Sequence, residues 1–308
     1  MKRNIYSYSK LWMIFFVLMG AACTNQVEDA IPVSGQPIEF SVQSDWKEIP
    51  NTRSNDKTQF IGGDEIQIFG FHTSPSNVVQ KFMYREDGSN RGQIVTYDGT
   101  SWNYSPKRFW PKEGTLDFYA SYPQNSIHND ADHRMMIYEQ TANSMKQDLL
   151  WGVSIKKCAD DRKNNVEITM YHALAKVNIF FDKSWGDIGT VMFLAYTAGR
   201  FTETDTDGIP KWIFNDGDKT TFNAKFGYDD LLRDDFGTFL TVFILPGNIT
   251  GFQMFNFSGN KIDGSDAISN EIQNKTFKAG QAYKLTIRRA QKNTNSRSIA
   301  MSVRCVSE

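Results

Sequence analysis

The chain has 308 residues, a formal net charge of −1 and a mean hydropathy of −0.47. A chain so close to neutral offers no electrostatic attraction for nucleic acid or an anionic membrane surface, and we expect neither as a partner. The sequence also lacks the G-x-S-x-G, P-loop and H-E-x-x-H patterns, so nothing in it points to an enzyme or to a bound cofactor.

Residues 1–22 have the order of a secretory leader. Lys2, Arg3 and Lys10 come first, and an apolar run over 11–22 ends in small residues just before Cys23. That run is too short to span a membrane, which takes about 20 residues. The last four letters, "GAAC", resemble a lipobox, the motif of bacterial lipoprotein signal peptides whose cysteine receives a diacylglyceryl group. We therefore expect cleavage before Cys23 and a lipid on its thiol; the alternative is an ordinary leader.

The polar segment 23–36 follows, with one Pro and one Gly, and is predicted to be a tether. Beyond it the apolar residues alternate with polar ones, which indicates half-buried β-strands. The clearest runs are 116–122, 175–181 and 283–287. Asp98-Gly99 within 94–104 predicts a hairpin turn, and the continuous apolar run 239–246 predicts a strand covered on both faces.

Evidence for helices is thin, with a few turns at most expected over 140–149 and 228–235. The fold class is therefore all-β, and turns every 8–12 residues suggest antiparallel sandwiches of ~100 residues each. We expect two sandwiches, an N-terminal domain over 37–160 and a C-terminal domain over 161–290. The boundary is placed in the polar segment 156–165, and residues 291–308 are left as a linker and a C-terminal strand.

Candidate chemistry is sparse. His128 and His133 lie in an Asp-rich stretch, but their spacing fixes no tetrahedral site, so we expect a solvated loop and no metal. "TDTDG" and "NDGD" are interpreted as turns, since the full calcium-loop alternation is missing. His172 is expected to be a hydrogen-bonded structural histidine. A disulfide between Cys158 and Cys305 and two free thiols are both compatible with an exported chain.

Several motifs in order resemble those of the fimbrillin family, the pilus subunits and pilus-associated lipoproteins of Gram-negative anaerobes. They are "NTRS" (51–54), "FIGGDEIQIFGF" (60–71), "WNYSPKRFWPKEGTLDFYASYP" (102–123), "DLLWG" (148–152), "EITMYHALAKVNIFF" (167–181), "FILPGN" (243–248) and "FKAGQAYKLTI" (277–287). The resemblance covers about 50–290. It implies two tandem transthyretin-like β-sandwiches, which agrees with the two domains expected from periodicity, and other pilus subunits as partners.

The resemblance also suggests a processing site. Fimbrillins that polymerise are cut by an arginine-specific protease early in the mature chain, which removes the first strand. The polar segment around Arg53 and Ser54 is the candidate here. An ordinary surface arginine is the alternative, since anchor-type members need not be cut. Trp102 and Trp110 within the longest motif are expected to pack in the sandwich; an exposed platform for sugars is the competing interpretation.

The tail carries a last strand pattern. Ile299, Met301, Val303 and Cys305 alternate with other residues after a polar linker. An extended segment of this kind can add to a vacated groove of a neighbouring subunit by main-chain hydrogen bonds. Residues 299–306 are therefore a candidate donor strand; the alternative is a strand that pairs with the protein's own sheet.

Taken together, the sequence predicts a lipid-anchored fimbrial subunit or accessory protein that contributes to adhesion. It would be attached to the outer membrane at the cell surface and assemble by donor-strand addition. The alternative is a monomeric surface lipoprotein that binds a glycan or a host protein.

Overall fold

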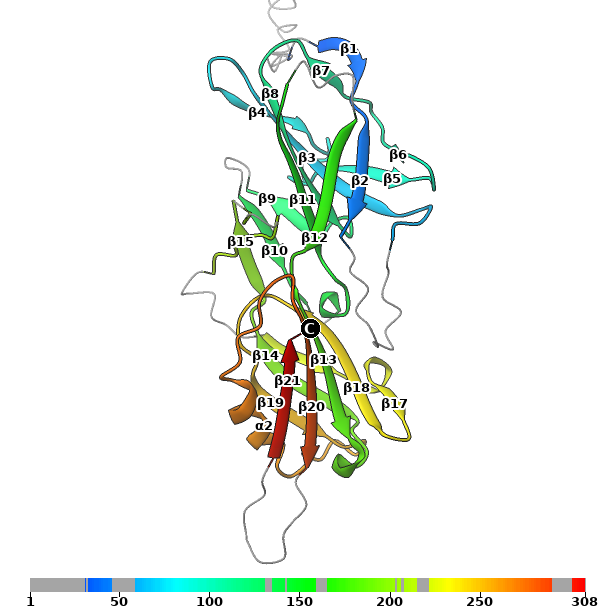
Figure 1. Ribbon diagram of the computed structural model, residues 1–308, viewed down its shortest axis with the longest axis vertical. Coiled ribbons are helices and arrows are strands. Elements are labelled where there is room, and N and C mark those ends of the chain that lie inside the picture. Colours follow the sequence, from blue (N-terminus) through cyan, green and yellow to red (C-terminus); the bar gives the residue numbers. More distant parts are fainter. Residues whose placement is uncertain are drawn as a thin grey trace, which may run out of the picture.

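The computed structural model is elongated, with two β-rich domains end to end and a small sheet between them (Figure 1). The structure describes residues 31, 33–45, 59–130, 135–141, 143–158, 165–202, 204–205, 208–214, 222–289 and 301–307, with only the backbone at 222–223 and 301–307 and no side-chain burial at 271. Among these residues no helix is both long and apolar enough to cross a membrane. The predicted all-β class with tandem sandwiches is confirmed.

The N-terminal domain is built on one eight-stranded sheet in the order β2-β12-β11-β8-β3-β5-β6, with β4 paired to β3. Its strands are β2 (Phe40–Ser44), β3 (Glu65–Thr73), β4 (Val79–Met83), β5 (Gln93–Tyr97), β6 (Trp102–Asn103), β8 (Thr115–Tyr122), β11 (Leu150–Lys157) and β12 (Val166–His172). A two-stranded ribbon of β1 (Val33–Pro37) and β7 (Phe109–Pro111) lies at the far end. Part of the predicted tether therefore forms a strand.

The eight-stranded sheet curls so that its two end strands meet. The indole Nε1 of Trp102 on β6 donates to the carbonyl oxygen of Val42 on β2 at 3.2 Å. Alternate residues of every long strand point into the enclosed core, as the period of two requires. Phe118 and Ala120 on β8 are examples, together with Ile66 and Ile68 on β3. The alternation predicted for 116–122 is confirmed.

The C-terminal domain is a sandwich of two sheets. The larger has the order β17-β18-β13-β20-β21 and the smaller β16-β14-β19. Their strands are β13 (Ala175–Asp182), β14 (Thr190–Ala195), β16 (Phe222–Phe226), β17 (Leu232–Asp234), β18 (Gly237–Ile244), β19 (Thr250–Phe255), β20 (Ala282–Arg289) and β21 (Met301–Ser307). Helix α2 (Ser265–Ile272) packs beside β19 and buries Ile268 and Ile272 in the core. The sequence patterns did not predict this helix.

A third sheet, β15-β10-β9, lies between the two domains. It consists of β9 (Ile127–Asn129), β10 (Met136–Glu139) and β15 (Ala198–Phe201). β15 comes from the C-terminal half of the chain and pairs antiparallel with β10 from the N-terminal half. An apolar cluster of its own, which we call the junction layer, joins this sheet to the outer face of the N-terminal sheet.

The chain passes from one domain to the other within two residues, Ala173 and Leu174. β12 ends at His172 and pairs with β11 and β2 in the N-terminal sheet, whereas β13 begins at Ala175 in the C-terminal sheet. The boundary expected between residues 160 and 161 falls before β12. We therefore propose a domain boundary at Ala173–Leu174, because the strands on either side of it belong to different sheets.

Candidate interaction site

The junction layer is centred on Trp151, which is 1% exposed. Trp151 is on the outer face of β11, because Leu150 and Gly152 alternate with it. Its indole stacks on Tyr119 of β8 with ring centroids 5.9 Å apart and meets the edge of Phe201 on β15 at 4.8 Å. Such aromatic pairs add to the stabilisation from apolar burial. β15 is thereby held on the N-terminal sheet.

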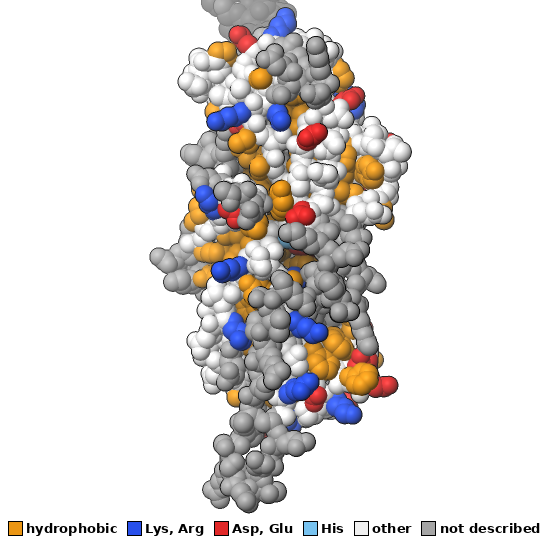
Figure 2. All heavy atoms as spheres, viewed as in Figure 1, with side chains coloured by type: hydrophobic (Ala, Val, Ile, Leu, Met, Phe, Trp, Pro, Cys, Tyr) orange, Lys and Arg blue, Asp and Glu red, His pale blue; other side chains and the backbone are white. Residues whose placement is uncertain are grey.

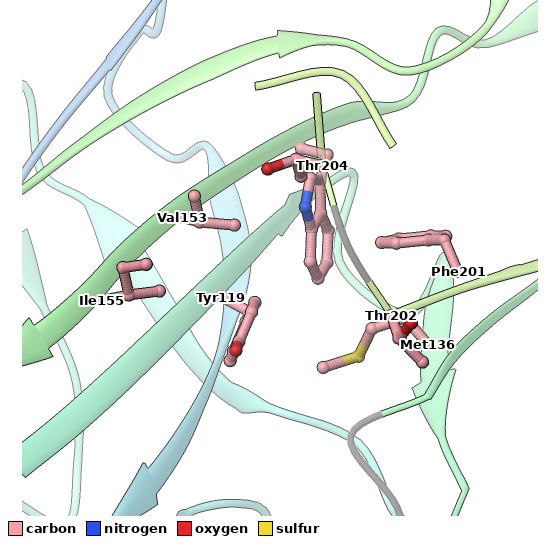
Figure 3. A pocket seen from close by; sticks show the side chains of 8 residues that line it. Tyr119, Met136, Val153, Ile155, Phe201, Thr202 and Thr204 are labelled. Atoms are coloured by element: carbon pink, nitrogen blue, oxygen red, sulfur yellow. The ribbon is translucent and has the colours of Figure 1, made fainter. Parts of the chain in front are cut away.

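A pocket of about 260 Å³ opens at the edge of this aromatic stack. Figure 3 shows the side chains around it, which come from the outer face of β8 and β11, from β10 and β15, and from the segment that follows β15. They are Tyr119, Met136, Trp151, Val153, Ile155, Phe201, Thr202 and Thr204. The lining is mainly apolar with three hydroxyl groups, the composition usual for a binding pocket. We call this cavity the Trp151 pocket.

One polar atom of the pocket lining is unsatisfied. The indole Nε1 of Trp151 is buried and has no hydrogen-bond partner in the described structure. By contrast, the indoles of Trp102, Trp185 and Trp212 each donate to a backbone carbonyl. A buried donor without an acceptor costs about 1–3 kcal/mol.

The rim of the pocket is shaped by a β-bulge in β11. The register with β8 shifts between Ser154 and Lys157, and Lys156 adopts φ 57° while its N–H donates to Asp117 at 2.8 Å. A bulge of this kind re-aims the side chains beside it. Ile155 is 52% exposed, and the side chain of Lys156 is exposed next to it. The rim is therefore apolar with positive charge beside it.

A second surface feature lies on the C-terminal domain, along the hairpin of β17 and β18. Figure 2 shows hydrophobic side chains gathered there, at the lower right, with acidic side chains beside them. Tyr228, Leu232, Phe236 and Phe257 are each more than half exposed. The Arg233 guanidinium lies 4.2 Å from the Tyr228 ring centroid and 5.3 Å from that of Phe257. We call this group the hairpin patch.

The predicted C-terminal strand is the outermost strand of the five-stranded sheet. The backbone of β21 pairs antiparallel with β20 from Tyr283↔Ser307 to Arg289↔Met301. Its other edge has no partner strand among the described residues. In this single chain, three of the four candidate donor positions, Met301, Val303 and Cys305, are thus paired within their own sheet, and Ile299 lies outside the described residues. Donation to another copy stays a prediction.

The other predicted modification sites are only partly placed. Cys23, Arg53 and Ser54 lie outside the described residues, so lipidation and processing stay predictions. Cys158 follows β11 in the N-terminal domain, whereas Cys305 is on β21 in the C-terminal domain. The structure does not bring their backbones into one sheet. Their disulfide stays a prediction.

His172 is a structural histidine, as expected. It ends β12, and its Nδ1 makes a hydrogen bond and an ion pair with a carboxylate oxygen of Asp148. Burial lowers the pKa of His172, but the hydrogen bond and charge of Asp148 outweigh it and raise that pKa above the usual value. Within the described residues no group of three or more His, Cys, Asp or Glu side chains could hold a metal ion; His133 is outside that set.

The tryptophans of the longest motif pack inside the N-terminal domain. Trp102 is 6% exposed and Trp110 is 1% exposed, which confirms the packing interpretation and rules out a sugar platform at these two positions. The expectation that 239–246 is covered on both faces holds only for the second half of the segment. On the outer face Phe239 and Thr241 are partly exposed, whereas Phe243 and Leu245 are buried in the junction layer.

The fold defines an all-β protein built from tandem sandwiches. A family model described as fimbrillin-like matches residues 52–302. This is most of the chain, and the chain therefore belongs to the fimbrillin-like family. No match was found among curated proteins.

Solved structures resemble this fold at low sequence identity. A candidate cell adhesion protein from Bacteroides uniformis has a TM-score of 0.52 and 18% identity, over 88% of this chain and 97% of that one. A candidate cell adhesion protein from Bacteroides ovatus has a TM-score of 0.49 and 12% identity, over 89% and 97%. The fimbrial anchor protein Mfa2 from Porphyromonas gingivalis has a TM-score of 0.45 and 9% identity, over 87% of this chain and 96% of that one.

Proposed function

We propose that this protein is a fimbrial subunit or accessory protein at the cell surface that contributes to adhesion and has a structural, non-catalytic role. The observation that carries the proposal is the fimbrillin-like match over 52–302, joined to a fold of two tandem sandwiches. The similarity in fold to a candidate cell adhesion protein from Bacteroides uniformis supports it. Its partners are other fimbrial subunits.

Attachment to the outer membrane through a lipid on Cys23 is part of this proposal. The support comes from the sequence, where a basic start, a short apolar run and small residues precede Cys23. A lipoprotein carries two or three acyl chains, enough for stable anchoring where a single chain gives only marginal binding. Processing between Arg53 and Ser54 would then convert the anchored precursor into a form ready for assembly.

Assembly by donor-strand addition is supported by the position of β21. This strand is at the edge of its sheet, where its backbone pairs with that of β20. β13, β18 and β20 pair with one another without it. Its departure to a second copy would therefore leave the central ladder of the sheet intact, and an equivalent main-chain ladder would form on the acceptor.

Deleting residues 299–308 tests this mode of assembly. We expect the monomer to keep nearly the same melting temperature while protease-treated protein no longer forms polymers visible by electron microscopy. A clear drop in monomer stability would mean that the strand belongs to its own sheet. A wild-type chain that stays monomeric after protease treatment and binds on a glycan array would instead support a monomeric surface lipoprotein.

A further inference from the structure

Phe236 is the most exposed large hydrophobic side chain among the described residues, at 68%. It lies in the two-residue turn between β17 and β18. Asp234 Oδ1 accepts hydrogen bonds from the N–H groups of Phe236 at 2.8 Å and Gly237 at 3.1 Å, and the Phe236 carbonyl accepts from the Lys183 N–H at 3.1 Å. The turn is thus fixed with its phenyl ring in solvent. A group held in this way loses little conformational entropy when it binds.

The Trp151 pocket has the size and lining to take such a ring. Its volume of about 260 Å³ is below the ~300–1,000 Å³ typical of pockets for drug-sized ligands, so a single side chain suits it better. Tyr119 and Phe201 offer aromatic contacts, and Met136 offers a thioether, which packs favourably against an aromatic ring.

The charges around the two features are complementary. Asp234 and Asp235 come directly before Phe236 and give the turn two acidic side chains. The basic residues beside them are the exposed Lys183 and Arg233, and the guanidinium of Arg233 lies over the Tyr228 and Phe257 rings. Beside the pocket rim, Lys156 is exposed and Lys157 is half-exposed. Opposite charges at the edge of a contact favour one orientation of encounter and disfavour others.

We propose that the Phe236 turn of one copy of this chain seats in the Trp151 pocket of a second copy. This inference rests on the proposed assembly into a fimbria and names a contact distinct from the strand exchange. In Figure 1, β15 and β10 lie near the middle of the molecule on the left, and β17 lies at the lower right, towards the far end of the C-terminal domain. Such a heterologous contact leaves a free turn and a free pocket on each pair, so it extends into a chain of copies.

Photo-crosslinking of the full chain at the cell surface tests the contact directly. Position 236 is replaced by p-benzoyl-phenylalanine, and position 257 receives the same group as a control, because Phe257 is also exposed on the hairpin patch. We expect a crosslinked dimer from position 236, with mass spectrometry locating the adduct on Met136, Val153 or Ile155. Adducts elsewhere, or a yield no higher than from position 257, would overturn the contact.

Charge reversal provides a second readout. Asp235→Lys and Lys156→Asp should each lower the yield of crosslinked dimer about tenfold, and the double variant should restore it. Unchanged melting temperatures would show that all three variants fold. Failure of the double variant to restore the dimer would contradict the pairing. If fimbriae form but this crosslink is absent, the contact is refuted and the proposed function stands. If the crosslink forms in cells that make no fimbriae, the proposed function is refuted and the contact stands.

Discussion

His172 and Asp148 form a hydrogen-bonded ion pair where the N-terminal sheet meets the junction between the domains. His172 is the last residue of β12, separated by two residues from the first strand of the C-terminal sheet, and Asp148 precedes β11. The pair therefore ties two neighbouring strands together at the crossing. Lys176 and Asp45 exert weaker and opposite charge effects on the same imidazole.

This pair predicts a pH dependence of stability. The pKa of His172 is raised in the folded state, because Asp148 outweighs the opposing effect of burial. The stabilisation is therefore fully present below about pH 6.5, the unfolded value, and is lost as pH rises through the raised pKa. Asp148→Asn should lower the free energy of unfolding by about 1–2 kcal/mol at pH 6 and remove this dependence. Urea denaturation from pH 5 to 9 measures it, and identical slopes for both proteins would contradict it.

Gly237 should tolerate no side chain. A Cβ there would lie 2.1 Å from the carbonyl oxygen of Phe181 and 2.7 Å from the Phe180 ring. Gly237→Ala would force β18 away from β13, and we expect a loss of about 1–3 kcal/mol. Gly227→Ala is the matched control, since nothing lies within 4 Å of its Cβ. Thermal unfolding of both variants measures the difference, and equal melting temperatures would disprove the close approach of Gly237 to the Phe181 carbonyl.

Two buried indoles should respond differently to the same substitution. Trp102→Phe breaks the hydrogen bond to Val42 and leaves a buried carbonyl without its donor, whereas Trp151→Phe removes an N–H that has no partner. Trp102→Phe should therefore cost about 1–2 kcal/mol more in the free energy of unfolding. Chemical denaturation of the two variants gives the comparison. A larger loss for Trp151→Phe would mean that its N–H is satisfied in solution.

Cys23→Ala should move the protein from the membrane fraction to the soluble fraction. Without the thiol no diacylglyceryl group can be attached, and the tether has no apolar stretch to replace it. Fractionation followed by immunoblotting measures the shift, with Cys158→Ala as the control that should remain in the membrane. Unchanged partitioning of Cys23→Ala would exclude a lipid on that residue as the anchor.

Local sequence patterns predicted several of the strands. The alternating runs at 116–122, 175–181 and 283–287 correspond to β8, β13 and β20, because one face of each strand is buried against a core. Helix α2 was missed, because its eight residues bury only two isoleucines at helical spacing and offer little else to detect. The partners of β12, the strands β2 and β11, could not be predicted, because one of the two pairings joins residues far apart in the sequence.

The interaction surfaces could not be predicted for a related reason. Tyr119 and Trp151 meet because β8 pairs with β11, and Phe201 reaches them because β15 returns to pair with β10. No local spacing encodes that return. The exposure of Phe236 is equally a tertiary property, because the residue lies between the segments 228–235 and 239–246 and neither pattern indicates which side chains face solvent.

The two parallel pairs, β2 with β12 and β13 with β20, set the order in which the protein can fold. β2 is synthesised early but cannot pair with β12 until Val166–His172 has been made, and β13 cannot pair with β20 until Ala282–Arg289 has been made. Contacts at such sequence separations form slowly, because the loop between them must close first. Each domain therefore remains incomplete until its late strand is available, and a nascent chain keeps an open sheet edge through most of its synthesis.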